Sequence, residues 1–431
     1  MSQSSLLQDL LTFLRLSPTP YHAVANMAAS LTHAGFTRLD EREPWQLEPG
    51  KAYFFTRRDA SILAFRYGTQ PLGSSGIRML GAHTDSPCLK IKPRPERVSQ
   101  GYWQLGVEVY GGALLSPWFD RDLSIAGRVA VATHTGQIRH ELINFARPIA
   151  VIPSLAIHLD RTVNEQRSIN PHEEMRPVLL QEGGNANFRQ VLREELTRTG
   201  HCTDVTEVLE YDLHLYDTQP PALTGLHEEF ISSARLDNLL SCYLGLQALL
   251  QADGGESCLL LLTDHEEVGS QSDIGARSNL LNACLTRWLG GGELRYQTLA
   301  NSMFVSVDNA HGIHPNYPRK HDENHGPLLN AGPVLKVDAN QGYATSSETA
   351  ALIRLWAQQA GVSLQVFVTR ADMRCGSTIG PMTAAQTGVR SLDIGLPTFA
   401  MHSIRELAGS ADPAAMLALL NQYLAAPMFT T

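Results

Sequence analysis

Two adjacent glutamates follow one of the most apolar stretches of the chain. Residues 259–270 read LLLLTDHEEVGS, so Glu266 and Glu267 come directly after a run that is typical of a buried strand. Two carboxylates at the end of such a strand carry a desolvation cost that a bound cation would offset. Because neighbouring side chains project differently, one glutamate could bind a metal while the other accepts a proton from a water molecule.

Further acids and histidines stand where other predicted strands end. His83 and Asp85 follow the apolar segment IRML, Asp308 follows MFVSV, and His402 comes after LDIGLP. Asp237 stands just before a long apolar helical segment. Ligands of open α/β sheets bind beyond the carboxyl ends of the strands, so these side chains are expected on one common rim.

The side chains on this rim are of the types that hold divalent metals. Imidazole and carboxylate ligands without a thiolate suit Zn²⁺, Mn²⁺ or Co²⁺. Five such ligands are too many for one tetrahedral ion with an open position, but they fit two ions that share a bridging carboxylate. Three carboxylates and one hydroxide would also balance the charge of two divalent cations. The pattern therefore predicts a two-metal centre.

Each of these residues has a structural alternative. His83 and Asp85 could be an ordinary polar pair, although their spacing on a predicted strand would place them on one face, where Asp85 could orient a ligating imidazole. Asp237 could be a helix N-cap, and the two glutamates could lie in a solvated loop. A tract with four histidines (residues 311–325) offers rivals to His402. The occurrence of all these residues at strand ends favours the metal centre.

Two kinds of sequence pattern alternate along the chain. Residues 5–90, and those from about 230 onward, combine apolar strands with helical segments, which predicts a mixed, mainly parallel sheet flanked by helices. Between them, YWQLGVEVY and VTEVLEYDLHLYD alternate with period two, which predicts a β-rich part. We expect a discontinuous α/β catalytic domain (1–94 and 231–431) with an inserted β-rich oligomerisation domain (95–230). The segments KIKPRPERVSQG and DTQPPALTG are predicted to cross between the two.

Composition limits the classes of function. The chain has 431 residues, a formal charge of −9 and 43% hydrophobic residues, as in ordinary globular proteins, and this charge argues against nucleic-acid binding. No signal peptide or membrane-spanning stretch is recognisable. Six cysteines without a CxxC pair are typical of reduced thiols. We expect a cytoplasmic protein without nucleic-acid or membrane partners.

Six motifs, in this order, resemble the M18 metallopeptidases, the aspartyl aminopeptidase family. They read GAHTDSPCLKIKP, SARLDN, DHEEVGS, HPNYPRKHDENHGP, TIGP and AMHSIRE, and the resemblance runs nearly end to end from SPTPYHAV at residues 17–24. It implies an aminopeptidase with two Zn²⁺ per subunit, for which Co²⁺ or Mn²⁺ could substitute, and with a preference for N-terminal Asp or Glu. It also implies a dimerisation role for the inserted domain and assembly of the subunits into dodecamers.

The resemblance assigns five metal ligands, with Asp237 shared between the two ions. One ion would be held by His83, Asp237 and Asp308, and the other by Asp237, Glu267 and His402.

Two further residues take catalytic roles by the same resemblance. Glu266 matches the general base, which would accept a proton as a metal-bridging hydroxide attacks the peptide carbonyl. Asp85 matches the acid that orients His83.

Four residues resemble substrate-binding positions of the family: His158, His311, Lys336 and Tyr343. His158 would reach from the inserted domain into the active site of a neighbouring subunit, although on sequence alone it could be a buried histidine in an apolar segment. Lys336 would favour acidic N-terminal residues through its charge, although it could also be a solvated lysine.

Two other functions stay open at this point. One is a two-metal peptidase of neutral or broad specificity, or an amidohydrolase. The other is a catalytically silent assembly protein, against which the complete ligand set with Glu266 speaks.

Overall fold

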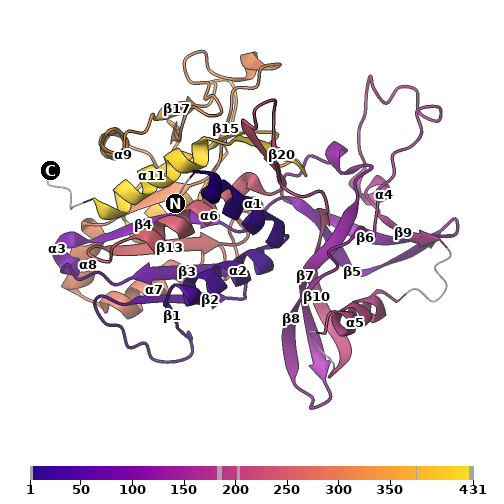
Figure 1. Ribbon diagram of the computed structural model, residues 1–431, viewed down its shortest axis with the longest axis horizontal. Coiled ribbons are helices and arrows are strands. Elements are labelled where there is room, and N and C mark those ends of the chain that lie inside the picture. The colour runs from indigo at the N-terminus through magenta and orange to yellow at the C-terminus, as the bar shows by residue number, and fades with distance from the viewer. Residues whose placement is uncertain (1–2, 182–186, 201–203, 375, 427–431) are drawn as a thin grey trace. The chain divides into compact units, whose positions relative to one another are not determined.

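Two units make up the structure, a computed structural model that describes residues 3–181, 187–200, 204–374 and 376–426 (Figure 1). The first unit comprises Met1–Asp85, Pro221–Met401 and Glu406–Thr431, and the second comprises Ser86–Pro220 and His402–Arg405. The predicted limits of the inserted part are residues 95 and 230, whereas the contacts within the structure place them at 86 and 220. Its role in oligomerisation stays a prediction.

The first unit is built on a nine-stranded sheet in the order β1-β2-β3-β13-β4-β14-β18-β16-β17. The strands are β1 (Thr37–Arg38), β2 (Ala52–Arg57), β3 (Ser61–Arg66), β4 (Ile77–His83), β13 (Ser257–Thr263), β14 (Met303–Val307), β16 (Val334–Val337), β17 (Gln365–Val368) and β18 (Arg390–Gly395). Five of the eight pairings are parallel, including β13–β4, β4–β14 and β14–β18. The expected mixed, mainly parallel sheet is confirmed.

Helices cover both faces of this sheet, which is why its central strands are continuously apolar. Every residue of β4, β13 and β14 is buried. Leu80 and Leu260 pack into a cluster with one set of helices, whereas Met79 and Leu259 pack into a second cluster with the other set. The first set is α1 (Gln3–Leu16), α2 (Pro20–His33), α6 (Leu236–Gln251), α9 (Ser347–Gln359) and α11 (Asp412–Ala425). The second is α7 (Leu280–Leu289), α8 (Glu293–Ala300) and α10 (Ile379–Thr387), after the short helix α3 (Leu72–Ser75).

A small sheet completes the first unit. Its order is β11-β12-β20-β19-β15, with β11 (Ala222–Thr224), β12 (Phe230–Ser233), β20 (Glu406–Gly409), β19 (Pro397–Phe399) and β15 (Ala310–His311). β12 leads into α6, which carries Asp237, and β15 follows β14 and Asp308. The small sheet is therefore connected to the segments that carry these two predicted metal ligands.

The second unit is an antiparallel sheet in the order β8-β7-β10-β5-β6-β9. Its strands are β5 (Cys88–Ser99), β6 (Tyr102–Tyr110), β7 (Leu123–Thr133), β8 (Ile138–Asn144), β9 (Val178–Gln181) and β10 (Val205–Asp217), with helices α4 (Pro171–Glu174) and α5 (Phe188–Arg198). The predicted crossing KIKPRPERVSQG (residues 90–101) is wrong, since residues 90–99 belong to β5 and the last two follow it. Its prolines, Pro93 and Pro95, fall where the pairing of β5 with β6 is interrupted between Ile91 and Glu96, so no ladder N–H is missed there.

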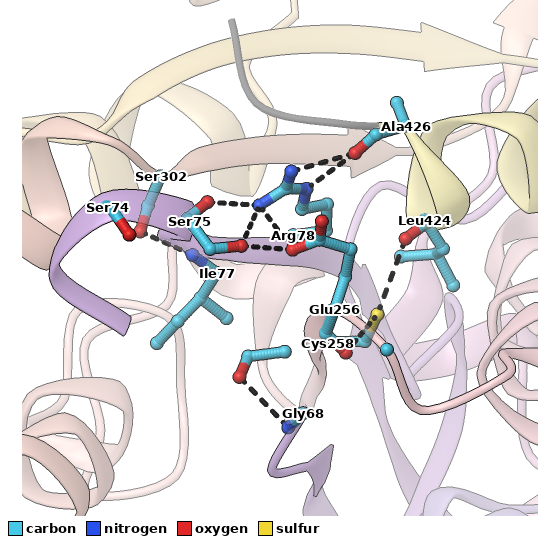
Figure 2. A network of polar contacts seen from close by, with 12 residues as sticks. Gly68, Ser74, Ser75, Ile77, Arg78, Glu256, Cys258, Ser302, Leu424 and Ala426 are labelled. Atoms are coloured by element: carbon cyan, nitrogen blue, oxygen red, sulfur yellow. Dashed lines mark hydrogen bonds and ion pairs between the residues drawn. The ribbon is translucent and has the colours of Figure 1, made fainter. Parts of the chain in front are cut away.

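A buried arginine fixes the amino end of β4. Arg78 is 2% exposed, and its Nε and Nη2 donate to the carbonyl oxygen of Ala426 at 3.2 and 2.7 Å (Figure 2). The guanidinium also contacts Ser75 and lies 3.4 Å from the carboxylate of Glu256, just before β13. These contacts hold the end of α11 against the amino end of β4. The predicted metal centre is at the opposite, carboxyl end of the same strand.

The described residues include four buried free thiols, those of Cys88, Cys242, Cys258 and Cys284. Within the same ranges, no helix has the length and apolar character needed to cross a bilayer.

Candidate metal centre

Sheet order brings the predicted ligands of the first unit together at the carboxyl end of β4. His83 is the last residue of β4 and pairs with Thr263, the last residue of the parallel strand β13. Glu266 and Glu267 follow within a 3-10 turn (Glu266–Val268), and Asp308 follows β14 on the other side of β4. Parallel strands end on the same edge, so residues far apart in sequence meet there.

Three of these side chains form one compact group. The Nε2 of His83 lies 3.5 Å from Oδ1 of Asp237 and 3.5 Å from Oδ1 of Asp308, and one ligand atom of each lies within 4.8 Å of the others. The Nδ1 of His83 lies 3.1 Å from the carbonyl oxygen of Asp85 and donates to it, which leaves Nε2 available for a metal. Burial opposes charge on this imidazole, but the facing carboxylates outweigh it and raise the pKa of His83 well above its ordinary value.

The adjacent glutamates extend the group. Ligand atoms of His83, Glu266 and Glu267 lie within 4.8 Å of one another, as do those of Glu267 and Asp237. Burial, with smaller effects of the neighbouring charges, raises the pKa of Glu266 to about 7 and that of Glu267 to about 10. The alternative of a solvated loop is therefore wrong for this pair. Oxygen and imidazole donors crowded in this way fit zinc, whose charge would stabilise the ionised carboxylates.

Asp85 has more contacts than the sequence predicted. β4 ends at His83, so Asp85 is not on the strand, and the predicted strand alternation is wrong for this pair. Its Oδ1 lies 3.4 Å from Nδ1 of His83, and its two oxygens accept the backbone N–H groups of Glu266 and Glu267, each at 3.1 Å. One buried carboxylate therefore holds the turn that carries both glutamates and lies beside the imidazole of His83, and its role in orienting that ring stays a prediction.

Asp237 is not the helix N-cap. That position belongs to Arg235, and Asp237 and Asn238 have non-helical backbone angles in the first turn of α6. The N–H of Asp237 donates to Oε2 of the buried Glu406 at 3.0 Å, and Nδ2 of Asn238 donates to the carbonyl oxygen of Val307 at 2.9 Å. Sequence reasoning missed Glu406 and Asn238. Their signal was their position inside the motifs AMHSIRE and SARLDN.

Two predicted site residues belong to the second unit. His402 lies in its short segment His402–Arg405, where its Nδ1 donates to the carbonyl oxygen of Gly112 at 3.2 Å and leaves Nε2 for a metal. Its place among the ligands stays a prediction. His158 is exposed in a turn, so the alternative of a buried histidine is wrong.

Lys336 is a buried lysine, not a solvated one. Its side chain is 2% exposed, and Nζ lies 3.3 Å from Oδ2 of Asp308 and 2.9 Å from the carbonyl oxygen of Asn309. The buried ring of Tyr343 lies beneath it, with the ring centre 5.0 Å from Nζ. Lys336 thus neutralises the second oxygen of a predicted ligand, and its direct contact with a substrate stays a prediction.

A cavity of about 290 Å³ opens beside His311. Its described lining is rich in basic side chains and includes no acidic one; the basic residues are His311, His314, Lys320, His321, Arg370 and Arg374.

The basic residues of this cavity differ in the charge they offer. Arg370 is paired with Asp372, at 2.9 and 2.7 Å. Desolvation, followed by the charge of Lys336, lowers the pKa of His311 even though part of its ring is exposed, and burial lowers the pKa of His321. Lys320 and Arg374 therefore supply most of the positive charge in this cavity.

Known proteins resemble the chain over nearly its full length. Residues 13–424 match the family described as aminopeptidase I zinc metalloprotease (M18). A probable M18 family aminopeptidase 2 of Pseudomonas savastanoi pv. phaseolicola is 55% identical over 425 residues, which cover 98% of this chain and 99% of that protein.

Solved structures agree with this match. A chain in a cryo-EM structure of the Ape4 and Nbr1 complex has a TM-score of 0.93 and 38% identity, covering 98% of this chain and 86% of that one. The mApe1 dodecamer of S. cerevisiae has a TM-score of 0.85 and 27% identity, covering 98% and 96%. The chain is a metalloaminopeptidase and belongs to the M18 family.

Proposed function

We propose that this enzyme binds two zinc ions and releases the N-terminal residue of peptides, with a preference for Asp and Glu. The observation that carries the proposal is the convergence of His83, Asp237, Asp308 and Glu267, with Glu266 beside them. His402 completes the proposed set as the fifth ligand. In this assignment Asp237 is shared, since its ligand atoms lie within 4.8 Å of both His83 and Glu267.

The chain's own residues divide the chemistry between them. Zinc bound here would polarise the scissile carbonyl and lower the pKa of a water molecule. Glu266 accepts the proton of the attacking water and delivers it to the leaving amine. Burial raises the pKa of Glu266, and the charge of bound zinc would oppose that effect and favour the ionised form that can accept a proton. Asp85 fixes the backbone of Glu266 and thus the position of its carboxylate.

The basic cavity supports the preference for acidic N-terminal residues. His311 lines the cavity and comes three residues after Asp308 in the chain, so the cavity lies near one of the proposed ligands. A carboxylate side chain entering there would meet Lys320 and Arg374 without an acidic neighbour in the described lining. Lys336 and Tyr343 are buried and do not line this cavity. We propose that they affect the substrate indirectly, through Asp308 and His311.

An exposed apolar loop supports assembly into a homo-oligomer, which we propose is a dodecamer like that of S. cerevisiae mApe1. Leu155, Ile157 and Leu159 are 62%, 46% and 75% exposed on either side of His158. Large apolar side chains grouped in this way are typical of a surface that a partner covers. We propose that His158 reaches the substrate of a neighbouring subunit and that the enzyme works in the cytoplasm.

Replacement of the proposed general base tests the mechanism. Glu266→Gln should lower kcat by about 10²- to 10⁴-fold, because the amide cannot accept the proton, while zinc content and melting temperature stay near those of the unchanged enzyme. The measurement is turnover of a panel of acidic, neutral and basic aminoacyl substrates, with zinc determined in the same samples. Full activity of Glu266→Gln would contradict the assignment, and equal kcat/KM across the panel would favour a peptidase of broad specificity.

A further inference from the structure

The segment that carries Asp237 is held by side chains without an assigned role. We propose that Arg235 and Glu406 are positioning residues that fix Asp237, so that the junction between α1 and α2 is part of the support of the metal centre. The inference rests on the proposed role of Asp237 as the ligand shared by two zinc ions.

Helical hydrogen bonding does not determine where Asp237 lies. Its φ and ψ are −81° and 106°, and those of Asn238 are −123° and 24°, so α6 becomes regular only after both residues. N–H groups in the first turn of a helix have no partner within the helix. The N–H of Leu239 donates to the carbonyl oxygen of Arg235 at 3.2 Å across this irregular turn, and the position of the Asp237 carboxylate depends in addition on contacts outside α6.

Arg235 provides the first of these contacts. It has a left-handed backbone with φ of 59°, which costs about 1 kcal/mol or more for a residue with a side chain. Its guanidinium donates from Nε to the carbonyl oxygen of Ser17 at 3.1 Å and from Nη2 to that of Leu14 at 3.3 Å. Leu14 lies in the last turn of α1 and Ser17 directly follows the helix, where a positive charge is favourable. Arg235, two residues before Asp237, is therefore hydrogen-bonded to a point more than 200 residues earlier in the chain.

The α1–α2 junction is suited to serve as that fixed point. Ser17 and Thr19 are buried, at 0% and 1% exposure. Thr19 accepts the N–H of His22 through its Oγ1 as the N-cap of α2, and the same oxygen lies 2.8 Å from Nδ1 of His22. Burial, followed by the charge of Arg235, lowers the pKa of His22 to about 4, so its ring is neutral at physiological pH and does not repel the guanidinium. These contacts give a physical role to the motif SPTPYHAV.

Glu406 provides the second contact. Its side chain is 2% exposed, and its Oε2 accepts the N–H of Asp237 at 3.0 Å. Hydrogen bonds to an ionised carboxylate are about twice as strong as neutral ones. Glu406 begins β20 and pairs with Ser233 of β12, the strand that leads into Arg235. Glu406 of the small sheet thus holds both ends of the short segment 233–237, and the helix junction holds Arg235 in its middle.

Zinc affinity separates a positioning role from general stability. The zinc dissociation constant of the full-length enzyme is measured by competition with a chromogenic chelator, after metal removal and reconstitution. Arg235→Met and Glu406→Ala should each weaken binding by about 10- to 100-fold, as for other groups that orient metal ligands. Glu406→Gln keeps an acceptor oxygen and should lose less than Glu406→Ala. Arg235→Lys should recover part of what Arg235→Met loses.

Arg66 offers a matched control at the other end of α6. Its Nε and Nη2 donate to the carbonyl oxygens of Leu249 and Leu250 at 2.9 and 3.1 Å, in the same manner as Arg235 but far from the ligands along the helix. Arg66→Met should lower the melting temperature without changing zinc affinity. Equal zinc affinity in Arg235→Met, Arg66→Met and the unchanged enzyme would overturn the positioning role alone. Failure of the unchanged enzyme to bind zinc tightly would overturn the proposed function as well.

Discussion

Asp85→Asn tests whether one carboxylate holds both the histidine and the glutamate turn. Asp85 accepts two backbone N–H groups, one on each oxygen, from Glu266 and Glu267, both at 3.1 Å. The asparagine has a single acceptor oxygen, and its amide NH₂ would face the remaining N–H as a second donor. A lost hydrogen bond to a charged group is worth about 1.5–3 kcal/mol. At about 1.4 kcal/mol per factor of ten, the variant should lose roughly 10- to 150-fold in kcat and in zinc affinity together.

The assay is steady-state turnover at saturating zinc, combined with chelator competition on the same preparation. Asp412→Asn is the matched control, since Asp412 is also 1% exposed and accepts two backbone N–H groups, from Asn330 and Gly332 at 2.8 and 2.9 Å. It should leave kcat and zinc affinity unchanged because it touches no proposed ligand. If Asp85→Asn also kept both values, or if both variants lost them equally, the reasoning about the turn would be refuted.

Three further predictions follow from the charges of the first unit. Replacing both Lys320 and Arg374 with serine should raise KM for acidic aminoacyl substrates by about 10- to 100-fold, because these substrates lose charge-assisted contacts. KM for neutral substrates should change by no more than a factor of a few. Equal effects on both classes would contradict the role of the basic cavity. Chelation should abolish activity and lower the melting temperature. Free zinc at 1,000 times its dissociation constant should then restore activity and add about 4 kcal/mol to the free energy of unfolding. Scanning calorimetry and turnover assays would measure these changes. Burial raises the pKa of Asp412 from 3.8 to about 6, so between these pH values the folded state binds more protons than the unfolded one, and the free energy of unfolding should fall by on the order of 2 kcal/mol as pH rises from about 4 to about 6. Urea titrations at these two pH values should show a smaller change for Asp412→Asn, and an identical change would contradict the shift.

The sequence was informative where a residue's type and its place at a strand end pointed to the same role. Apolar strands followed directly by acids or histidines predicted the rim, and β4, β13 and β14 do end beside one another. His83, Asp237, Asp308 and the two glutamates converge as that pattern indicated.

The missed features depend on contacts that no local pattern encodes. Asp85 acts through backbone N–H groups 181 and 182 residues away, and backbone donors are the same in every sequence. Lys336 looks like an exposed lysine until the fold places Asp308 and Asn309 around its ammonium group. The strand through Pro93 and Pro95 was missed because proline is tolerated only where pairing is interrupted, and that interruption depends on the partner strand β6.

The position of β4 in the sheet has a consequence for how this protein is made. Both of its neighbours, β13 and β14, are translated later, and β13 begins about 170 residues after β4 ends. At about 5–20 residues per second, a ribosome needs roughly 10 to 35 s to reach it. During that interval seven residues destined for complete burial lack both of the strands that will cover their edges. The edges of β4 therefore stay unpaired until more than half of the chain has been made, and the proposed metal ligands cannot meet at its carboxyl end before then.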